Sequence, residues 1–146
     1  MSDNIFTSPQ SWFSLTLPNG WSEYEDEEGT YAFFNVKHWT GNFRITPFKW
    51  EQTNNPGDDK AGKYILGELN DNEGAIEIKV GAFSCAHFKK SIIQDTGEFV
   101  IYYWITGQGN NLFICSFTID KKQEETRENK SELEKVAQII KSIRIK

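Results

Sequence analysis

Four stretches of apolar or alternating residues follow one another between positions 75 and 119, and only short turns separate them. The first and the last alternate with a period of two, as half-buried strands do, and the third in order is apolar throughout, as in a strand covered on both faces. Short turns rich in Gly, Asn and Asp join antiparallel neighbours. We therefore predict an antiparallel meander of strands over residues 75–80, 83–93, 98–106 and 112–119.

The alternation also predicts which side chains enter the core. Ile76, Ile78 and Val80 alternate with charged residues and are expected to point inward. In the last stretch one face carries only apolar side chains: Phe113, Cys115, Phe117 and Ile119.

The first fifty residues repeat this pattern with shorter strands. The predicted strands are 13–17, a brief one from Trp21, 30–36 and 42–48. In the last of these, Phe43 and Ile45 share one face and Arg44 lies on the other. Pro47 has no N–H to donate, so this strand is expected to end there or to lie at a sheet edge.

Two segments have helical spacing instead. Residues 58–71 follow Asp58 or Asp59 as a cap and carry an apolar stripe of Ala61, Ile65, Leu66 and Leu69. Near the C-terminus, Ser131 and Glu134 suggest a capping box before a second apolar stripe. That stripe contains Leu133, Val136, Ala137, Ile140 and Ile143.

The order of elements is thus four strands, a helix, four strands and a helix. It predicts an α+β fold in which an antiparallel sheet of about seven to eight strands is sandwiched by a short middle helix and a C-terminal helix. The length predicts a single domain over residues 1–146, with 1–10 as a short N-terminal extension.

Composition limits the partners that such a domain takes. Residues 37–50 interleave aromatic with basic side chains, as surfaces that bind single-stranded nucleic acid do. The whole chain nevertheless has 16 Lys and Arg against 21 Asp and Glu, a net charge of −5. Because phosphate binding favours a basic excess, we expect no nucleic-acid partner.

Targeting signals are also missing from the sequence. The N-terminal residues lack the basic and long apolar regions of a signal peptide. No run approaches the ~18 apolar residues of a membrane-spanning helix. We therefore expect a cytoplasmic protein without membrane insertion.

The residues that carry metal or bond-making chemistry are few. Cys85 and His87 share one face of a predicted strand, and Cys115 or His38 would complete a partial zinc set. Structural zinc sites have four ligands in paired short spacings, which this chain lacks. The cysteines are expected to be buried free thiols, and we predict no metal, no cofactor and no catalytic residue.

Two surface features remain as candidate contact surfaces. Five acidic residues in six positions, Glu23–Glu28, predict a solvated loop or a docking patch for a basic partner. Trp39 and Trp50 flank the ends of one strand, where a ring stays exposed or enters the core. The candidate partner-binding residues are Glu25, Asp26, Glu27, Glu28, Trp39, Arg44 and Trp50.

Several segments resemble PsbP-like domains. The segment FSLTLPNGW resembles the first strand and turn with which these domains open. The segment HWTGNFRIT resembles their crossing between the third and fourth strands. Their closing hairpin and last helix are matched by YYWITGQGNNLFICSFTID and ELEKVAQIIKSIRI. Within this fold the chain most resembles an uncharacterised bacterial family from Bacteroides-type genomes. The resemblance implies an antiparallel sheet between helices and a binding protein rather than an enzyme.

These observations favour a non-enzymatic protein-binding domain, with a toxin-immunity protein or an effector chaperone as specific forms. The alternative is a small-ligand or carbohydrate binder that uses an aromatic pocket. An enzyme would require a cleft that gathers His38, His87 and a shielded carboxylate.

Overall fold

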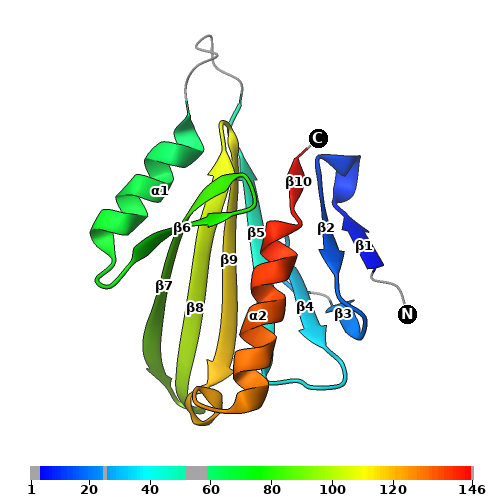
Figure 1. Cartoon of the computed structure of the whole chain (residues 1–146), viewed down its shortest axis with the longest axis vertical. Coiled ribbons are helices and arrows are strands. Elements are labelled where there is room, and N and C mark those ends of the chain that lie inside the picture. Colours follow the sequence, from blue (N-terminus) through cyan, green and yellow to red (C-terminus); the bar gives the residue numbers. More distant parts are fainter. Residues whose placement is uncertain (1–3, 25, 52–58, 146) are drawn as a thin grey trace.

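The computed structural model describes residues 4–24, 26–51 and 59–145. Figure 1 shows strands arranged in two sheets, together with two α-helices. The strands are β1 (Asn4–Thr7), β2 (Phe13–Leu17), β3 (Trp21–Tyr24), β4 (Tyr31–Asn35), β5 (Gly41–Lys49), β6 (Ile76–Val80), β7 (Phe83–Gln94), β8 (Gly97–Gln108), β9 (Asn111–Asp120) and β10 (Arg144–Ile145). The helices are α1 (Lys60–Asp71) and α2 (Arg127–Lys141), and two 3-10 turns lie at Pro9–Ser11 and Lys121–Gln123.

The large sheet has seven antiparallel strands in the order β3-β4-β5-β9-β8-β7-β6. The predicted meander is confirmed, because β6, β7, β8 and β9 are neighbours in chain order. β5 pairs with β9 along its whole length and joins the N-terminal strands to the meander. Short hairpins and this one crossover therefore give the expected antiparallel sheet.

A second, three-stranded sheet was not predicted. It has the order β1-β2-β10 and brings the two ends of the chain together. β1 lies within residues 1–10, which were expected to form an extension. With four and two residues, β1 and β10 are too short to show a periodic pattern of their own.

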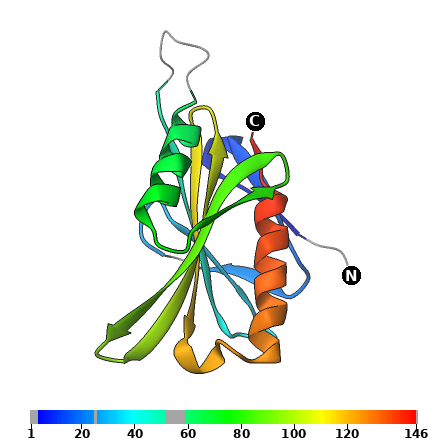
Figure 2. The same cartoon turned by 60° about the vertical axis from the view of Figure 1, so that its left-hand side comes forward.

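The two helices cover opposite faces of the large sheet (Figure 2), so the predicted α+β sandwich is confirmed. α1 begins at the cap Asp59, whose side chain accepts a hydrogen bond from the Gly62 N–H. It packs Ala61 and Ile65 against the meander. α2 lies on the other face, where it shares a core with the small sheet. Neither helix has the length and apolar content needed to cross a membrane, and the described residues contain no other α-helix.

The core on the α2 face is built largely from aromatic rings. The fully buried rings on this face are Phe13, Phe33, Phe43, Phe113 and Phe117. Trp12 stacks on Phe113 with 5.6 Å between ring centroids, and Trp21 and Trp104 are buried in the same cluster. Since a fully buried ring of this size contributes roughly 1.5–3 kcal/mol, this cluster stabilises the fold strongly. It also contains three of the five tryptophans.

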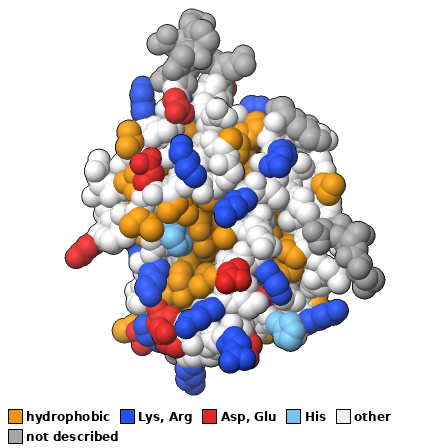
Figure 3. Space-filling view, in the orientation of Figure 1, with side chains coloured by type: hydrophobic (Ala, Val, Ile, Leu, Met, Phe, Trp, Pro, Cys, Tyr) orange, Lys and Arg blue, Asp and Glu red, His pale blue; other side chains and the backbone are white. Residues whose placement is uncertain are grey.

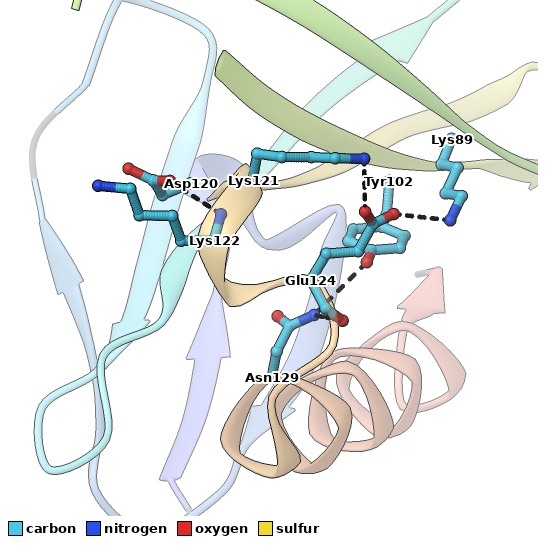
Figure 4. Close-up of polar contacts among 7 residues, drawn as sticks. All are labelled: Lys89, Tyr102, Asp120, Lys121, Lys122, Glu124 and Asn129. Atoms are coloured by element: carbon cyan, nitrogen blue, oxygen red, sulfur yellow. Dashed lines mark hydrogen bonds and ion pairs between the residues drawn. The ribbon is translucent and has the colours of Figure 1, made fainter. Parts of the chain in front are cut away.

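Polar contacts fasten the start of α2 to the sheet. Figure 3 shows the molecule in the orientation of Figure 1. Hydrophobic side chains gather over the middle of this view, and Lys and Arg side chains lie around the end where α2 begins. Glu124 accepts hydrogen bonds from Lys89 at 2.8 Å and from Lys121 at 2.7 Å (Figure 4). The buried Asn129 lies 3.4 Å from the Tyr102 hydroxyl. β7, β8 and α2 thereby meet at one polar cluster.

Some local expectations were wrong. Leu66 is 58% exposed, because only Ala61, Ile65 and Leu69 of the predicted stripe face the sheet. Ile76 is 55% exposed, because it begins the edge strand β6.

The expected start of the C-terminal helix and the expected end of β5 also differ. Thr126 caps α2 by accepting a hydrogen bond from the Asn129 N–H, and Ser131 lies inside the helix. β5 continues through Pro47 to Lys49. The pairing with β4 ends at Ile45, so Pro47 lies where β5 has a free edge on that side, as the second expected alternative had it.

Candidate binding site

The face of the large sheet beneath α1 is covered at one end only. α1 lies over β7, β8 and part of β9. Toward β3, β4 and β5 the same face carries half-exposed side chains from alternating positions, because successive residues of a strand point to opposite faces. Phe33 thus enters the α2-side core, whereas its neighbour Phe34 points to the open part.

Three rings and one amide line a surface pocket in this open part. Tyr24 of β3, Phe34 of β4, Trp39 and Asn42 of β5 surround a volume of about 300 Å³. The Tyr24 and Phe34 rings meet edge to face at 5.5 Å, and Phe34 and Trp39 at 6.5 Å. We call these four residues the aromatic patch.

Trp39 is the most exposed member of the aromatic patch, with 65% of its surface accessible. Its indole Nε1–H donates a hydrogen bond to Asn42 Oδ1 at 3.1 Å. Trp39 also lines a second pocket of about 270 Å³, which includes Phe99 and Thr118. The ring therefore borders two pockets, and its hydrogen bond to Asn42 orients it, as in a pre-organised binding anchor.

An ion pair joins β5 to the acidic loop, which we define as Asp26, Glu27 and Glu28. Arg44 Nε donates to Asp26 Oδ2 at 2.7 Å, with 35% and 19% of the two side chains exposed. The hydrogen bond from Arg44 holds the pKa of Asp26 below its ordinary value. Burial raises the pKa of the Tyr24 hydroxyl. The charge of Arg44 opposes this rise, and the charge of Asp26 adds to it. Charge and rings thus form one continuous surface.

The acidic loop borders the patch through Tyr24. The Glu27 and Glu28 residues are exposed, and together with Glu23 and Asp26 they line a hollow of about 590 Å³ that Tyr24 also lines. The predicted residue Glu25 lies outside the described residues. The loop is closed by a hydrogen bond from the Thr30 N–H to the Glu27 carbonyl at 3.1 Å.

Trp50 does not belong to this surface. It is half-buried at the other end of β5, where its ring contacts Phe48 at 5.0 Å and Tyr64 of α1 at 6.4 Å. A nine-residue strand spans roughly 30 Å, so Trp39 and Trp50 cannot serve one small site. Of the predicted contact residues, the structure therefore brings together Asp26–Glu28, Trp39 and Arg44.

Tyr24, Phe34 and Asn42 were not among the predicted site residues. The face on which they lie could be predicted from the alternation of side chains along a strand. Phe34 is adjacent to the core residue Phe33, and Asn42 is adjacent to the core residue Phe43. Their proximity depends on the pairing of Ser22 with Phe34 and of Ala32 with Arg44. That register is set by the assembled sheet and not by any local motif.

The residues considered for metal or nucleophile chemistry do not assemble. Burial raises the pKa of the Cys85 thiol to about 12 and also raises that of Cys115. The His87 ring stacks on Trp104 at 4.8 Å, and its Nδ1 lies 2.8 Å from the Tyr103 carbonyl oxygen. Within the described ranges, no three His, Cys, Asp or Glu side chains are placed to hold a metal ion.

Solved structures with a similar fold come from several bacteria. A crystal structure from Bacteroides thetaiotaomicron VPI-5482 is 35% identical, with a TM-score of 0.79, and the match covers 100% of this chain and 49% of that one. This chain thus spans about half the length of that relative. No curated protein matches.

Two further structures are 10% identical. LpqN, involved in cell envelope biogenesis of Mycobacterium tuberculosis, has a TM-score of 0.55, with 99% of this chain and 84% of that chain covered. The cyanobacterial PsbP (CyanoP) of Synechocystis sp. PCC 6803 has a TM-score of 0.44, with 99% and 93% covered.

The model of one protein family matches the chain from residue 1 to residue 146. Its description is "Domain of unknown function (DUF3805)". Together with the Bacteroides relative, this match confirms the expected uncharacterised bacterial family. The chain therefore belongs to the DUF3805 family.

Proposed function

We propose that this chain is a non-enzymatic, cytoplasmic protein-binding domain, and that the aromatic patch with the acidic loop is its contact surface. The observation that carries the proposal is Trp39, which is 65% exposed and yet fixed by Asn42 and Phe34. Tryptophans presented in this way dominate the binding energy of many protein interfaces, because little side-chain freedom is lost on binding.

The charges beside the patch favour one kind of partner. Asp26, Glu27 and Glu28 place negative charge next to an apolar anchor, on a chain whose net charge is −5. Such a surface complements a partner with a hydrophobic pocket bordered by Lys or Arg, and it speeds their encounter. A toxin neutralised by an immunity protein and an effector held by a chaperone are the two partner types that we propose.

A pull-down with matched variants tests this proposal. Wild type, Trp39→Ala and Trp50→Ala are each used to capture proteins from a native lysate, with quantification by mass spectrometry. We expect a protein that wild type and Trp50→Ala recover and that Trp39→Ala loses. The two variants each remove one tryptophan at opposite ends of β5, so loss of an indole alone does not explain a difference. Recovery that is independent of Trp39, or recovery of no specific protein, would contradict the proposal.

A carbohydrate ligand is the second candidate. It is favoured by the pocket of three rings and one amide, because sugars stack their apolar faces on rings and bond their hydroxyls to amides. A thermal-shift screen separates the two candidates. A ligand present at a concentration 100 times its Kd stabilises the folded state by about 2.7 kcal/mol. A rise in Tm with a sugar that Trp39→Ala abolishes would favour this alternative.

A further inference from the structure

A further pocket lies between the β4–β5 connection and the first half of α2. Figure 1 shows this connection passing beside the start of α2. The pocket has a volume of about 250 Å³. It is lined by His38, Arg127, Glu128, Ser131, Glu132 and Lys135. None of these residues lines either pocket beside Trp39.

Glu132 is an unusual lining residue, because only 1% of its surface is exposed. Its Oε2 accepts a hydrogen bond from Asn35 Nδ2 at 2.9 Å. Its Oε1 is buried and has no hydrogen-bond partner among the described residues. Buried polar atoms almost always have a partner, and an unpaired carboxylate oxygen is costly. This oxygen therefore points to a donor other than the described residues, such as a bound ligand.

The pocket contains charges of both signs. Arg127 and Lys135 are positive, and neither forms a hydrogen bond or ion pair through its side chain with any residue the structure describes. Glu128 and Glu132 balance them, so the lining is close to neutral overall. A near-neutral lining with charges of both signs complements a ligand with one charge of each sign.

Helical spacing separates the two signs within the pocket. Arg127, Ser131 and Lys135 follow each other at intervals of four and form one stripe of α2, while Glu128 and Glu132 form the neighbouring stripe. Ser131 lies one turn, roughly 6 Å along the axis, from each of the two cations. An anionic group over Ser131 can therefore reach both, while a cationic group faces Glu132.

From these observations we propose that this pocket binds a free α-amino acid in its zwitterionic form. The ammonium group donates to Glu132 Oε1, and the carboxylate lies over Ser131 between Arg127 and Lys135. The volume of about 250 Å³ is just below the ordinary range of drug-sized pockets and suits a ligand of this size. The proposal is independent of the partner-binding surface at Trp39.

Differential scanning fluorimetry and calorimetry with the full chain test it. The probes are the twenty free L-amino acids, with sodium acetate and ethylamine hydrochloride as single-charge controls. We expect at least one amino acid to raise Tm, and both controls to have no effect at the same concentration. If no amino acid shifts Tm, or if acetate alone shifts it equally, the proposal is overturned.

Matched variants then assign the site. Lys135→Ala and Arg127→Ala should each weaken binding about tenfold, whereas Lys130→Ala, an exposed lysine of the same helix that does not line the pocket, should leave it unchanged. Unchanged affinity in Lys135→Ala and Arg127→Ala would overturn the proposal. Glu132→Gln should lose binding that Glu134→Gln retains. If Glu132→Gln fails to fold, the exposed Arg127 and the half-buried Lys135 still decide the question.

Discussion

The two faces of the large sheet differ in how completely they are covered. The α2 face is closed along its length by a helix, a small sheet and a cluster of aromatic rings. The opposite face is covered by α1 over the meander only, and toward β3–β5 it presents Tyr24, Phe34 and Trp39 in half-exposed or exposed positions. One face therefore supplies most of the stability. The other leaves aromatic side chains partly exposed to solvent.

This division is sharpest in β4, where two phenylalanines follow each other. Phe33 is fully buried on the α2 face, and Phe34 lies in the aromatic patch. Because the side chains have the same chemistry and adjacent positions, substitutions here compare the two faces directly.

The largest expected effect is on stability at Phe33. Phe33→Ala should lower the free energy of unfolding by about 3–5 kcal/mol, because it leaves a cavity among buried rings. Phe34→Ala should lower it by only about 1 kcal/mol, the order of its edge contacts with two neighbouring rings. Urea unfolding with unchanged m-values measures both. Equal losses would show that the open face is as structural as the covered one.

The next effect concerns the polar contact between α2 and the sheet. Asn35→Ala removes the donor to Glu132 Oε2 and the acceptor for the Lys37 and His38 N–H groups. We expect a loss of about 1–3 kcal/mol at pH 7, because buried polar groups lose their partners. Unfolding with matched buffers at several pH values measures it.

The pH dependence of this loss has a definite sign. Burial raises the pKa of Glu132 in the folded state, and Asn35 opposes that rise. A raised carboxyl pKa means that stability is fully present below the unfolded value and is lost as pH rises through the folded one. The deficit of Asn35→Ala should therefore shrink as pH falls toward the ordinary glutamate pKa. A deficit that grows on acidification would contradict this assignment.

The smallest effect is expected on the open face, at the ion pair between Asp26 and Arg44. Asp26→Asn should cost less than about 1 kcal/mol, since the pair is partly exposed to solvent. Arg44 lowers the pKa of Asp26, so its contribution is present above the unfolded pKa and is lost as pH falls through the folded one. Chemical unfolding at low and at 1 M salt should show the difference from wild type vanish at high salt. A salt-insensitive loss of several kcal/mol would instead make the acidic loop structural.

Much of this architecture can be predicted from sequence, because the meander strands carry their own pattern. The alternation of Phe113, Cys115 and Phe117 identifies a buried face of β9, and all three are buried. β1 and β10 could not be predicted in this way, because their pairing with β2 is decided by the assembled core.

The candidate site was predictable only in part. Trp39, Arg44 and the acidic loop could be predicted from local sequence, because charged residues and aromatic rings at strand ends are often exposed. Trp50 gave the same signal but packs against Tyr64 of α1, a contact between elements that no local pattern records. Phe34 and Asn42 required the register of β3, β4 and β5.

The anchoring of a protein partner by Trp39 is the proposal on which the function depends. Calorimetric titration of the recovered partner with wild type, Trp39→Ala and Trp50→Ala tests it most directly. We predict that Trp39→Ala raises Kd by about 30-fold or more, equivalent to about 2 kcal/mol, while Trp50→Ala stays within about threefold of wild type. An unchanged Kd for Trp39→Ala, or a larger loss for Trp50→Ala, would contradict the claim.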